Sequence, residues 1–244
     1  MSDITNILKE LQAIEDDSVV DIFVPSVGRL VKFKPLSVKQ HHEILKCGID
    51  GISGSIKLSI ILNKIIIDNC LEPIDFMVYD SEWILLNLRI SNVGTSITLD
   101  ERIYNLGDLT RNVKLFDYTT VVSYKDINVQ LVVPTIKQDI EISEACYKDF
   151  SKGNIEDKKV SDTISSMLSY EIAKFIKTVS VNDTTIDFES LSINDKRKIL
   201  DSLPLTINNK ITDFITKYRN HEQVSYTFED GTVLLIDGDF LTRA

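Results

Sequence analysis

Apolar and polar residues alternate in two short stretches near the N-terminus. Residues 19–24 are mostly β-branched or aromatic, and residues 30–34 alternate Leu, Lys and Lys with Val and Phe, which is the period of a half-buried strand. Gly28 lies between them and supplies the positive φ that a tight loop favours. The pattern therefore predicts an N-terminal β-hairpin with one solvent-exposed and one buried face.

Signals for the start of a helix follow the hairpin directly. Pro35 ends the second strand, and Ser37 with Gln40 has the spacing of a capping box, in which two side chains bond the free N–H groups of a new helix. This helix is expected to reach Cys47. Three glycines in residues 48–54 then predict a flexible connector without the lysine or the spacing of a phosphate-binding loop.

Apolar residues at three- and four-residue intervals predict further helices along the chain. These helices are expected at residues 3–15, 55–71, 81–93, 135–150, 162–178, 192–203 and 206–219. Gly94 is expected to end the helix over 81–93 as its C′ residue. Two interpretations of the first helix stay open: it packs on the protein's own core, or it is an arm that binds a partner.

Short β-like segments occur between and after these helices. They cover residues 96–99, 113–116, 119–124, 129–133, 179–188 and a final hairpin of 224–228 with 232–236. The sequence thus predicts an α+β fold, with an N-terminal β-hairpin packed with several helices and a mixed C-terminal half with helices and short β-hairpins. We expect an N-terminal hairpin-helix domain at 1–95, a β-rich middle segment at 96–150 and a C-terminal helical region with a terminal hairpin at 160–244. The polar stretch 151–159 is expected to be a linker.

The charge balance narrows the classes of function. The chain has 27 Lys and Arg against 37 Asp and Glu, a net charge of -10, which repels a phosphate backbone. Its most apolar segment, residues 56–71, contains three charged residues and is too short to cross a bilayer. The N-terminus lacks the basic start and apolar run of a secretory signal. We therefore expect no nucleic-acid partner, no membrane partner and no export.

The histidines do not form a metal site in this pattern. His41 and His42 are neighbours on the predicted helix, so their side chains point about 100° apart and cannot hold one ion from the same face. We interpret both as surface residues that contact a partner, and we expect His221 to be a solvated residue at a helix end. No metal and no cofactor are expected.

Nothing in the sequence singles out a catalytic group. Cys47, Cys70 and Cys146 have no recognisable motif around them and are expected to be reduced core residues. A hydrolase that uses two carboxylates stays open as an alternative, although no acidic pair is distinguished from a solvated turn. We therefore expect no catalytic residue and no small-molecule substrate.

The order of several short motifs resembles a known family. The run VPSVGRLVKFKPLSVKQHHEILKC at 24–47 is followed by IIIDNCLE at 65–72 and by DSEWILLNLRISNVG at 80–94. This succession resembles the baseplate hub subunit and hub-assembly proteins of T4-like tailed phages, over about a third of the chain. The positions that match the family pattern are Pro25, Gly28, Lys32, Phe33, Pro35, Cys70, Trp83, Arg89 and Gly94.

The resemblance implies a protein that is not an enzyme and that binds other baseplate hub proteins, either as a hub subunit or as an assembly chaperone. It implies a location in the host cytoplasm during assembly, and in the tail baseplate of the virion if the protein stays as a hub subunit. The basic residues Arg29, Lys32 and Lys34 form the one local positive patch that we recognise in the sequence, and we predict that they bind the partner together with His41 and His42. A regulatory adaptor of the host cell stays open as a further alternative.

Overall fold

The chain folds into two compact units. The computed structural model describes residues 4–7, 10, 18–47, 51–111, 116–151, 160–223, 226–234 and 240–241. Unit 1 comprises Met1–Leu109 with Leu235–Ala244, and unit 2 comprises Thr110–Leu234. Unit 2 is therefore an insertion between two segments of unit 1. The three-part division predicted from the sequence stays a prediction.

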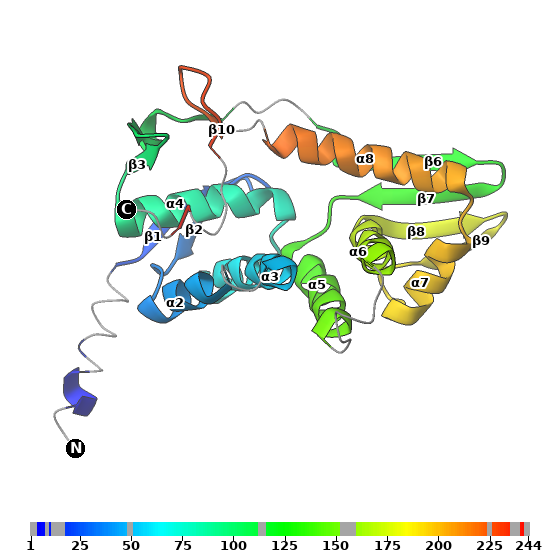
Figure 1. Ribbon diagram of the computed structural model, residues 1–244, viewed down its shortest axis with the longest axis horizontal. Helices are drawn as coiled ribbons and strands as arrows, with labels where there is room; N and C mark the ends of the chain where they lie inside the picture. Colours follow the sequence, from blue (N-terminus) through cyan, green and yellow to red (C-terminus); the bar gives the residue numbers. More distant parts are fainter. Residues whose placement is uncertain are drawn as a thin grey trace. The chain divides into compact units, whose positions relative to one another are not determined.

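Unit 1 begins with the predicted hairpin and continues mainly as helices (Figure 1). Its elements are β1 (Val20–Val24), β2 (Arg29–Phe33), α2 (Val38–Cys47), α3 (Gly51–Asn69), the 3₁₀ turn η1 (Val78–Asp80), α4 (Ser81–Val93), β3 (Ser96–Leu99), β4 (Arg102–Asn105) and the 3₁₀ turn η2 (Leu106–Asp108). The hairpin and the helices at 38–47 and 81–93 confirm the sequence predictions. The strand β4, which pairs with β3, was not predicted.

Helix α4 is the element around which unit 1 is built. The inner face of the hairpin contacts it. As the alternation predicted, the side chains on that face are buried; they are Ile22, Val24, Val31 and Phe33. The buried residues of α4 are Ser81, Ile84, Leu85, Leu86, Leu88 and Arg89. Because they occur in pairs and triplets along the helix, they cover much of its circumference, which is typical of a helix inside a core.

The side chain of Arg89 joins α4 to the end of the chain. It is fully buried, and its guanidinium donates to the carbonyl oxygens of Gly94 at 2.8 Å, Phe240 at 2.9 Å and Ser96 at 3.1 Å. The same group lies over the Phe240 ring, 5.3 Å from its centroid. Phe240 and Leu241 are themselves buried, so the C-terminal segment completes the core of unit 1.

Unit 2 consists of an antiparallel sheet with helices, and Figure 1 shows α8 running along β6, which it contacts. The sheet order is β6-β7-β8-β9, while the short strand β10 pairs with β5. The elements are β5 (Thr110–Arg111), β6 (Thr119–Tyr124), β7 (Ile127–Val132), α5 (Ile136–Ser151), α6 (Val160–Lys174), β8 (Ile176–Val181), β9 (Thr184–Asp187), α7 (Ile193–Ser202), α8 (Leu205–Gln223) and β10 (Tyr226–Thr227). The model thus confirms the predicted α+β class with an N-terminal hairpin.

Three local predictions were wrong. The expected connector at 51–54 is the first turn of α3. A glycine costs a helix only about 1 kcal/mol, so its presence does not prevent a helix. Gly54 is also buried, where the lack of a side chain allows close packing. The helix expected to reach residue 178 ends at Lys174, because Ile176 to Val181 pair with β7 as a strand. His221 is not a solvated residue, since its side chain is only 12% exposed.

Other predictions lie partly outside the described residues. This applies to most of the strand at 113–116, to the linker at 152–159 and to parts of the final hairpin at 224–225 and 235–236. Within the described part of that hairpin, Thr227 bridges Val233, and Gly231 has a φ of 85° in the turn. Of the first predicted helix, residues 4–7 and 10 are helical, and Ile4 and Ile7 are exposed.

Replacing Arg89 should strongly destabilise unit 1. We expect Arg89→Met to lower the free energy of unfolding by at least about 3 kcal/mol, because three carbonyl oxygens lose a charged donor. Arg89→Lys should not restore it, since one ammonium lacks the planar fork of a guanidinium. Denaturant unfolding checks this, with Lys39→Met, at an exposed position of α2, as the control that leaves the midpoint unchanged.

Candidate partner-binding surface

The outer side of the hairpin presents apolar and charged side chains to solvent. In the hairpin register Phe23 lies opposite Leu30, and Asp21 lies opposite Lys32. The segment after α3 pairs with β2 through one isolated bridge: Phe33 bridges Cys70, and the Leu71 amide donates to the Lys32 carbonyl at 2.9 Å. Leu71 therefore lies opposite Lys32 on the same side. We call these side chains the hairpin face; its members are Asp21, Phe23, Leu30, Lys32 and Leu71.

The hairpin face contains a cluster of exposed apolar side chains. Phe23 is 49% exposed, Leu30 57% and Leu71 45%. Two of them form a direct cross-strand pair and the third is diagonal to Leu30, so they are near enough to act as one contact area. Contiguous exposed apolar side chains bounded by charges are typical of a surface that binds another protein.

The turn of the hairpin is attached to the start of α4. The carboxylate of Asp80 is fully buried and accepts from the backbone amides of Ser26 and Met77, each at 3.0 Å. The indole Nε1 of Trp83 donates to the Phe23 carbonyl at 2.8 Å. Gly28 closes the turn with a φ of 70°. These contacts explain the Pro-Ser-Val-Gly turn and give the hairpin face a fixed position within unit 1.

The other end of β2 is held by Asn69, the last residue of α3. Its side-chain amide nitrogen donates to the carbonyl oxygens of Pro35 at 3.0 Å and Lys34 at 3.2 Å, and its amide oxygen accepts from Gln40 at 2.6 Å. The predicted capping box is confirmed, since the Ser37 amide donates to Gln40 at 2.9 Å and the Gln40 amide to the Ser37 hydroxyl at 3.2 Å. Asn69 thus links β2, α3 and α2.

The residues predicted to bind a partner lie at different places around this surface. Lys32 is on the hairpin face, whereas Arg29 follows the opposite alternation and pairs with Glu72 at 2.7 Å. The guanidinium of Arg29, together with the Lys32 backbone amide, holds the pKa of Glu72 below its ordinary value. Lys34 is half-buried at the end of β2, so Lys32 is the basic residue that stands among the exposed apolar ones.

His41 and His42 lie on α2, with ring centroids 6.4 Å apart. His42 is exposed and His41 is half-buried. Within the described ranges, no group of three or more His, Cys, Asp or Glu residues could hold a metal ion. The two histidines thus remain predicted contact residues and are not brought together with a third ligand.

Sequence reasoning missed the apolar part of the hairpin face. Leu30 was assigned to a wet side, and Phe23 was counted only as part of a strand-forming stretch. The useful signal was the register, because a loop of four residues places Phe23 directly opposite Leu30. Leu71 could not be found in this way, since its position depends on the chain returning to β2 after α3.

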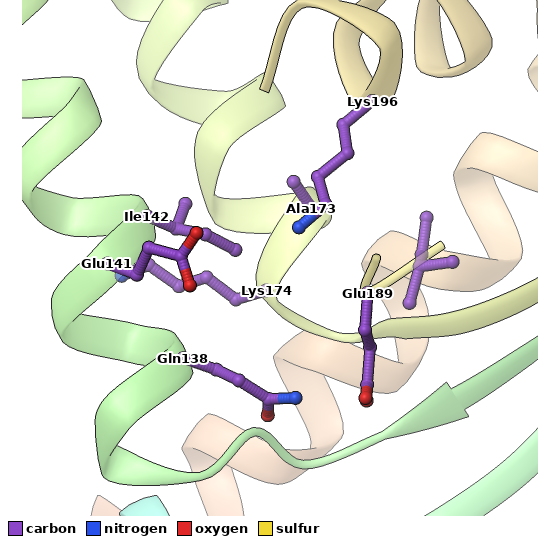
Figure 2. A pocket seen from close by; sticks show the side chains of 8 residues that line it. Gln138, Glu141, Ile142, Ala173, Lys174, Glu189 and Lys196 are labelled. Atoms are coloured by element: carbon purple, nitrogen blue, oxygen red, sulfur yellow. The ribbon is translucent and has the colours of Figure 1, made fainter. Parts of the chain in front are cut away.

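Unit 2 contains a pocket of about 180 Å³ (Figure 2). Its lining comes from α5, α6, α7, the start of β8 and the segment after β9. The residues are Gln138, Glu141, Ile142, Ala173, Lys174, Ile176, Glu189 and Lys196. One of them, Lys174, belongs to a chain of ion pairs that connects three helices.

The ion pairs run from α5 through α6 to α8. The ammonium of Lys174 lies 2.8 Å from Asp139 and 3.1 Å from Glu171, whose second oxygen lies 2.7 Å from Arg219. Burial by itself would raise the pKa of Glu171, but Lys174 and Arg219 lower it by more. Likewise, burial lowers the pKa of Lys174, and the two carboxylates outweigh that effect and raise it. Both groups are therefore charged at neutral pH.

The cysteines are poor nucleophiles. Cys47 is buried, and burial raises the pKa of Cys70 above its usual value and that of Cys146 to about 11. Because the thiolate is the reactive form, the thiols of Cys70 and Cys146 stay protonated and unreactive near pH 7. His221 stacks on Phe116 with ring centroids 5.3 Å apart, so it lies in an aromatic cluster of unit 2.

The hairpin face combines exposed apolar side chains with one basic and one acidic residue, Lys32 and Asp21. Exposed apolar patches with a polar border are typical of surfaces that bind other proteins. A family model described as T4 bacteriophage base plate protein matches residues 17–229. The chain belongs to this family, which confirms the resemblance to baseplate proteins of T4-like phages. Membership gives the protein a structural role in a phage baseplate, bound to other baseplate proteins of the virion tail.

No curated protein and no solved structure matches the chain. Among the described residues, no helix is both long and apolar enough to cross a membrane.

The attachment of the hairpin to α4 should depend on the negative charge of Asp80. We expect Asp80→Asn to cost about 2 kcal/mol, because an amide presents a donor to the N–H groups of Ser26 or Met77. Hydrogen exchange should speed up in β1 and β2, while Asp68→Asn, at an exposed position of α3, should change nothing. Unaltered protection of the hairpin in Asp80→Asn would contradict this role.

Acid should destabilise unit 2 through Glu171. Because its folded pKa lies below the usual value, its contribution to stability is present above the unfolded pKa of about 4.3 and is lost as pH falls through the folded pKa. Urea unfolding midpoints measured downward from about pH 5 should therefore fall less steeply in Glu171→Gln than in the unchanged protein. Parallel pH profiles would show that the ion pairs add no such term.

Proposed function

We propose that this protein is a component of the baseplate hub or a chaperone of hub assembly, and that it acts by binding other hub proteins. The family match supports a baseplate role, and the motif order at 24–47, 65–72 and 80–94 resembles hub and hub-assembly proteins. The single observation that carries the proposal is the hairpin face, where exposed apolar side chains surround a lysine on a strand pair anchored at both ends.

The partner surface that fits this face is apolar with an acidic group. Phe23, Leu30 and Leu71 offer apolar area, and such contacts provide most of the energy of a small interface. Lys32 adds a positive charge on a chain with net charge -10, which favours one orientation of an acidic partner over others. The predicted contacts of Arg29, Lys34, His41 and His42 belong to the border of this interface.

A hydrolase is the alternative from another class of function. It would need a cleft with an activated nucleophile or perturbed carboxylates. The raised thiol pKa values of Cys70 and Cys146 speak against a cysteine nucleophile. A host regulatory adaptor has no specific observation in its favour.

Substitutions on the hairpin face should weaken binding without unfolding the protein. We expect Lys32→Glu and Leu30→Asp each to reduce affinity for hub proteins by at least about tenfold, through lost charge complementarity and lost apolar contact. Co-purification of tagged variants from infected cells measures this. Matched controls are Lys177→Glu on β8 and Ile103→Asp on β4, which are also exposed.

The controls should retain the hub proteins recovered with the unchanged chain. If Lys32→Glu and Leu30→Asp retain them as well, the hairpin face is not the interface.

Mass spectrometry of purified phage particles then separates the two forms of the proposal. Recovery in stoichiometric amount identifies a hub subunit, and absence from particles with presence in assembly intermediates identifies a chaperone.

A further inference from the structure

The pocket of unit 2 contains the ammonium group of a largely buried lysine that has no partner of opposite charge among the described residues. Lys196 on α7 is only 6% exposed, and Figure 2 shows its side chain extending toward Ala173. Within the described residues its ammonium forms no ion pair or hydrogen bond; its contact is the face of the Phe188 ring, 5.9 Å away. A buried charge without a counter-ion is unfavourable, and here it faces an open cavity.

Two further donors line the same pocket. The side-chain oxygen of Gln138 accepts from the Thr135 amide at 2.9 Å, so the capping box at the start of α5 leaves its NH₂ group for the cavity, as Figure 2 shows. Lys174 uses its ammonium for Asp139 and Glu171, and its third proton is not needed for either. Donors from α5, α6 and α7 are thus gathered at one pocket.

We propose that this pocket binds a carboxylate group, with the ammonium of Lys196 as its counter-ion and the Gln138 amide as a second donor. A carboxylate has two oxygens in one plane and accepts from both. The apolar side chains of Ile142 and Ile176 line the same space and suit the short hydrocarbon stem that carries such a group.

The glutamates of the pocket restrict the charge of the ligand. Glu141 and Glu189 are exposed and line the pocket, and both repel an anion. Because repulsion grows with ligand charge, a singly charged carboxylate is favoured over a doubly charged phosphate.

This site lies in unit 2 and does not depend on the hairpin face. In the assembled baseplate the carboxylate that enters this pocket comes from an acidic side chain of a bound protein. A free carboxylic acid offers the same chemistry.

Lys196→Met separates a binding role from a structural one. If the ammonium is present for a ligand, replacing it with an apolar side chain of similar length removes a partly desolvated charge that has no counter-ion among the described residues. This should raise the melting temperature, by at most about 2–4 °C. The methionine sulfur keeps a contact with the Phe188 ring. Lys177→Met, at an exposed position of β8, should leave the melting temperature unchanged. A lower melting temperature for Lys196→Met would show that the ammonium supports the fold, and would overturn the proposal.

Direct binding is measured by titrating the full chain with sodium acetate at constant ionic strength. We expect saturable NMR shifts at the Gln138 side-chain NH₂ and the Ala173 amide, lost in Lys196→Met and retained in Lys177→Met. Sodium phosphate should bind more weakly than acetate. The absence of local shifts, their persistence in Lys196→Met, or tighter binding of phosphate would each overturn the assignment.

A blocked glutamate, N-acetylglutamate N-methylamide, distinguishes the two sources of the carboxylate. Binding at least as tight as that of acetate supports an acidic side chain of a protein partner. Binding of acetate alone supports a small free acid, because the backbone of the blocked residue is then excluded from the pocket. Either result is independent of whether hub proteins bind the hairpin face.

Discussion

The guanidinium of Arg89 is removed from water and, in return, donates to carbonyl oxygens near the end of α4, in β3 and in the C-terminal segment. A cation can be buried only when its hydrogen bonds are replaced in this way. The positions of these three segments are therefore tied to one side chain. Asp80, at the start of α4, and Trp83 within it also hold the hairpin. The hairpin and the C-terminal segment of unit 1 are therefore both positioned by the same helix.

The positions that carry the resemblance to the phage family lie largely at such junctions. Gly28 closes the turn that Asp80 holds, Trp83 bonds the backbone of β1, and Gly94 follows α4 with a φ of 110° next to Arg89. Cys70 pairs with β2 across a short bridge. These residues position the hairpin face, and Lys32 is the pattern position that also lies on it, whereas its apolar side chains, Phe23, Leu30 and Leu71, are supplied by other positions. The order of the motifs thus reflects the contacts that hold unit 1 together, and those contacts fix the position of the hairpin face.

The elements set by local rules could be predicted from the sequence. The hairpin, the capping box of Ser37 and Gln40, and the end of α4 at Gly94 each follow from residues within a few positions of one another. Predictions failed where distant segments decide the outcome. His221 is only 12% exposed, with Phe116 stacked on its ring. Ile176 leaves the helical pattern because β7 offers it a partner strand. After α3 the chain returns to β2, and this return pairs Arg29 with Glu72 and places Leu71 on the hairpin face. No pattern of neighbouring residues predicts that return.

The insertion of unit 2 into unit 1 also sets an order of events during synthesis. All of Thr110–Leu234 is made before Phe240, and because a ribosome adds residues one after another from the N-terminus, unit 2 has the chance to fold while Arg89 still lacks one of its carbonyl acceptors. The core of unit 1 closes last, when Phe240 and Leu241 are in place. A chain without Phe240 and Leu241 would leave Arg89 short of one acceptor and α4 incompletely packed, so the helix that holds the hairpin is finished by residues made more than a hundred positions after it.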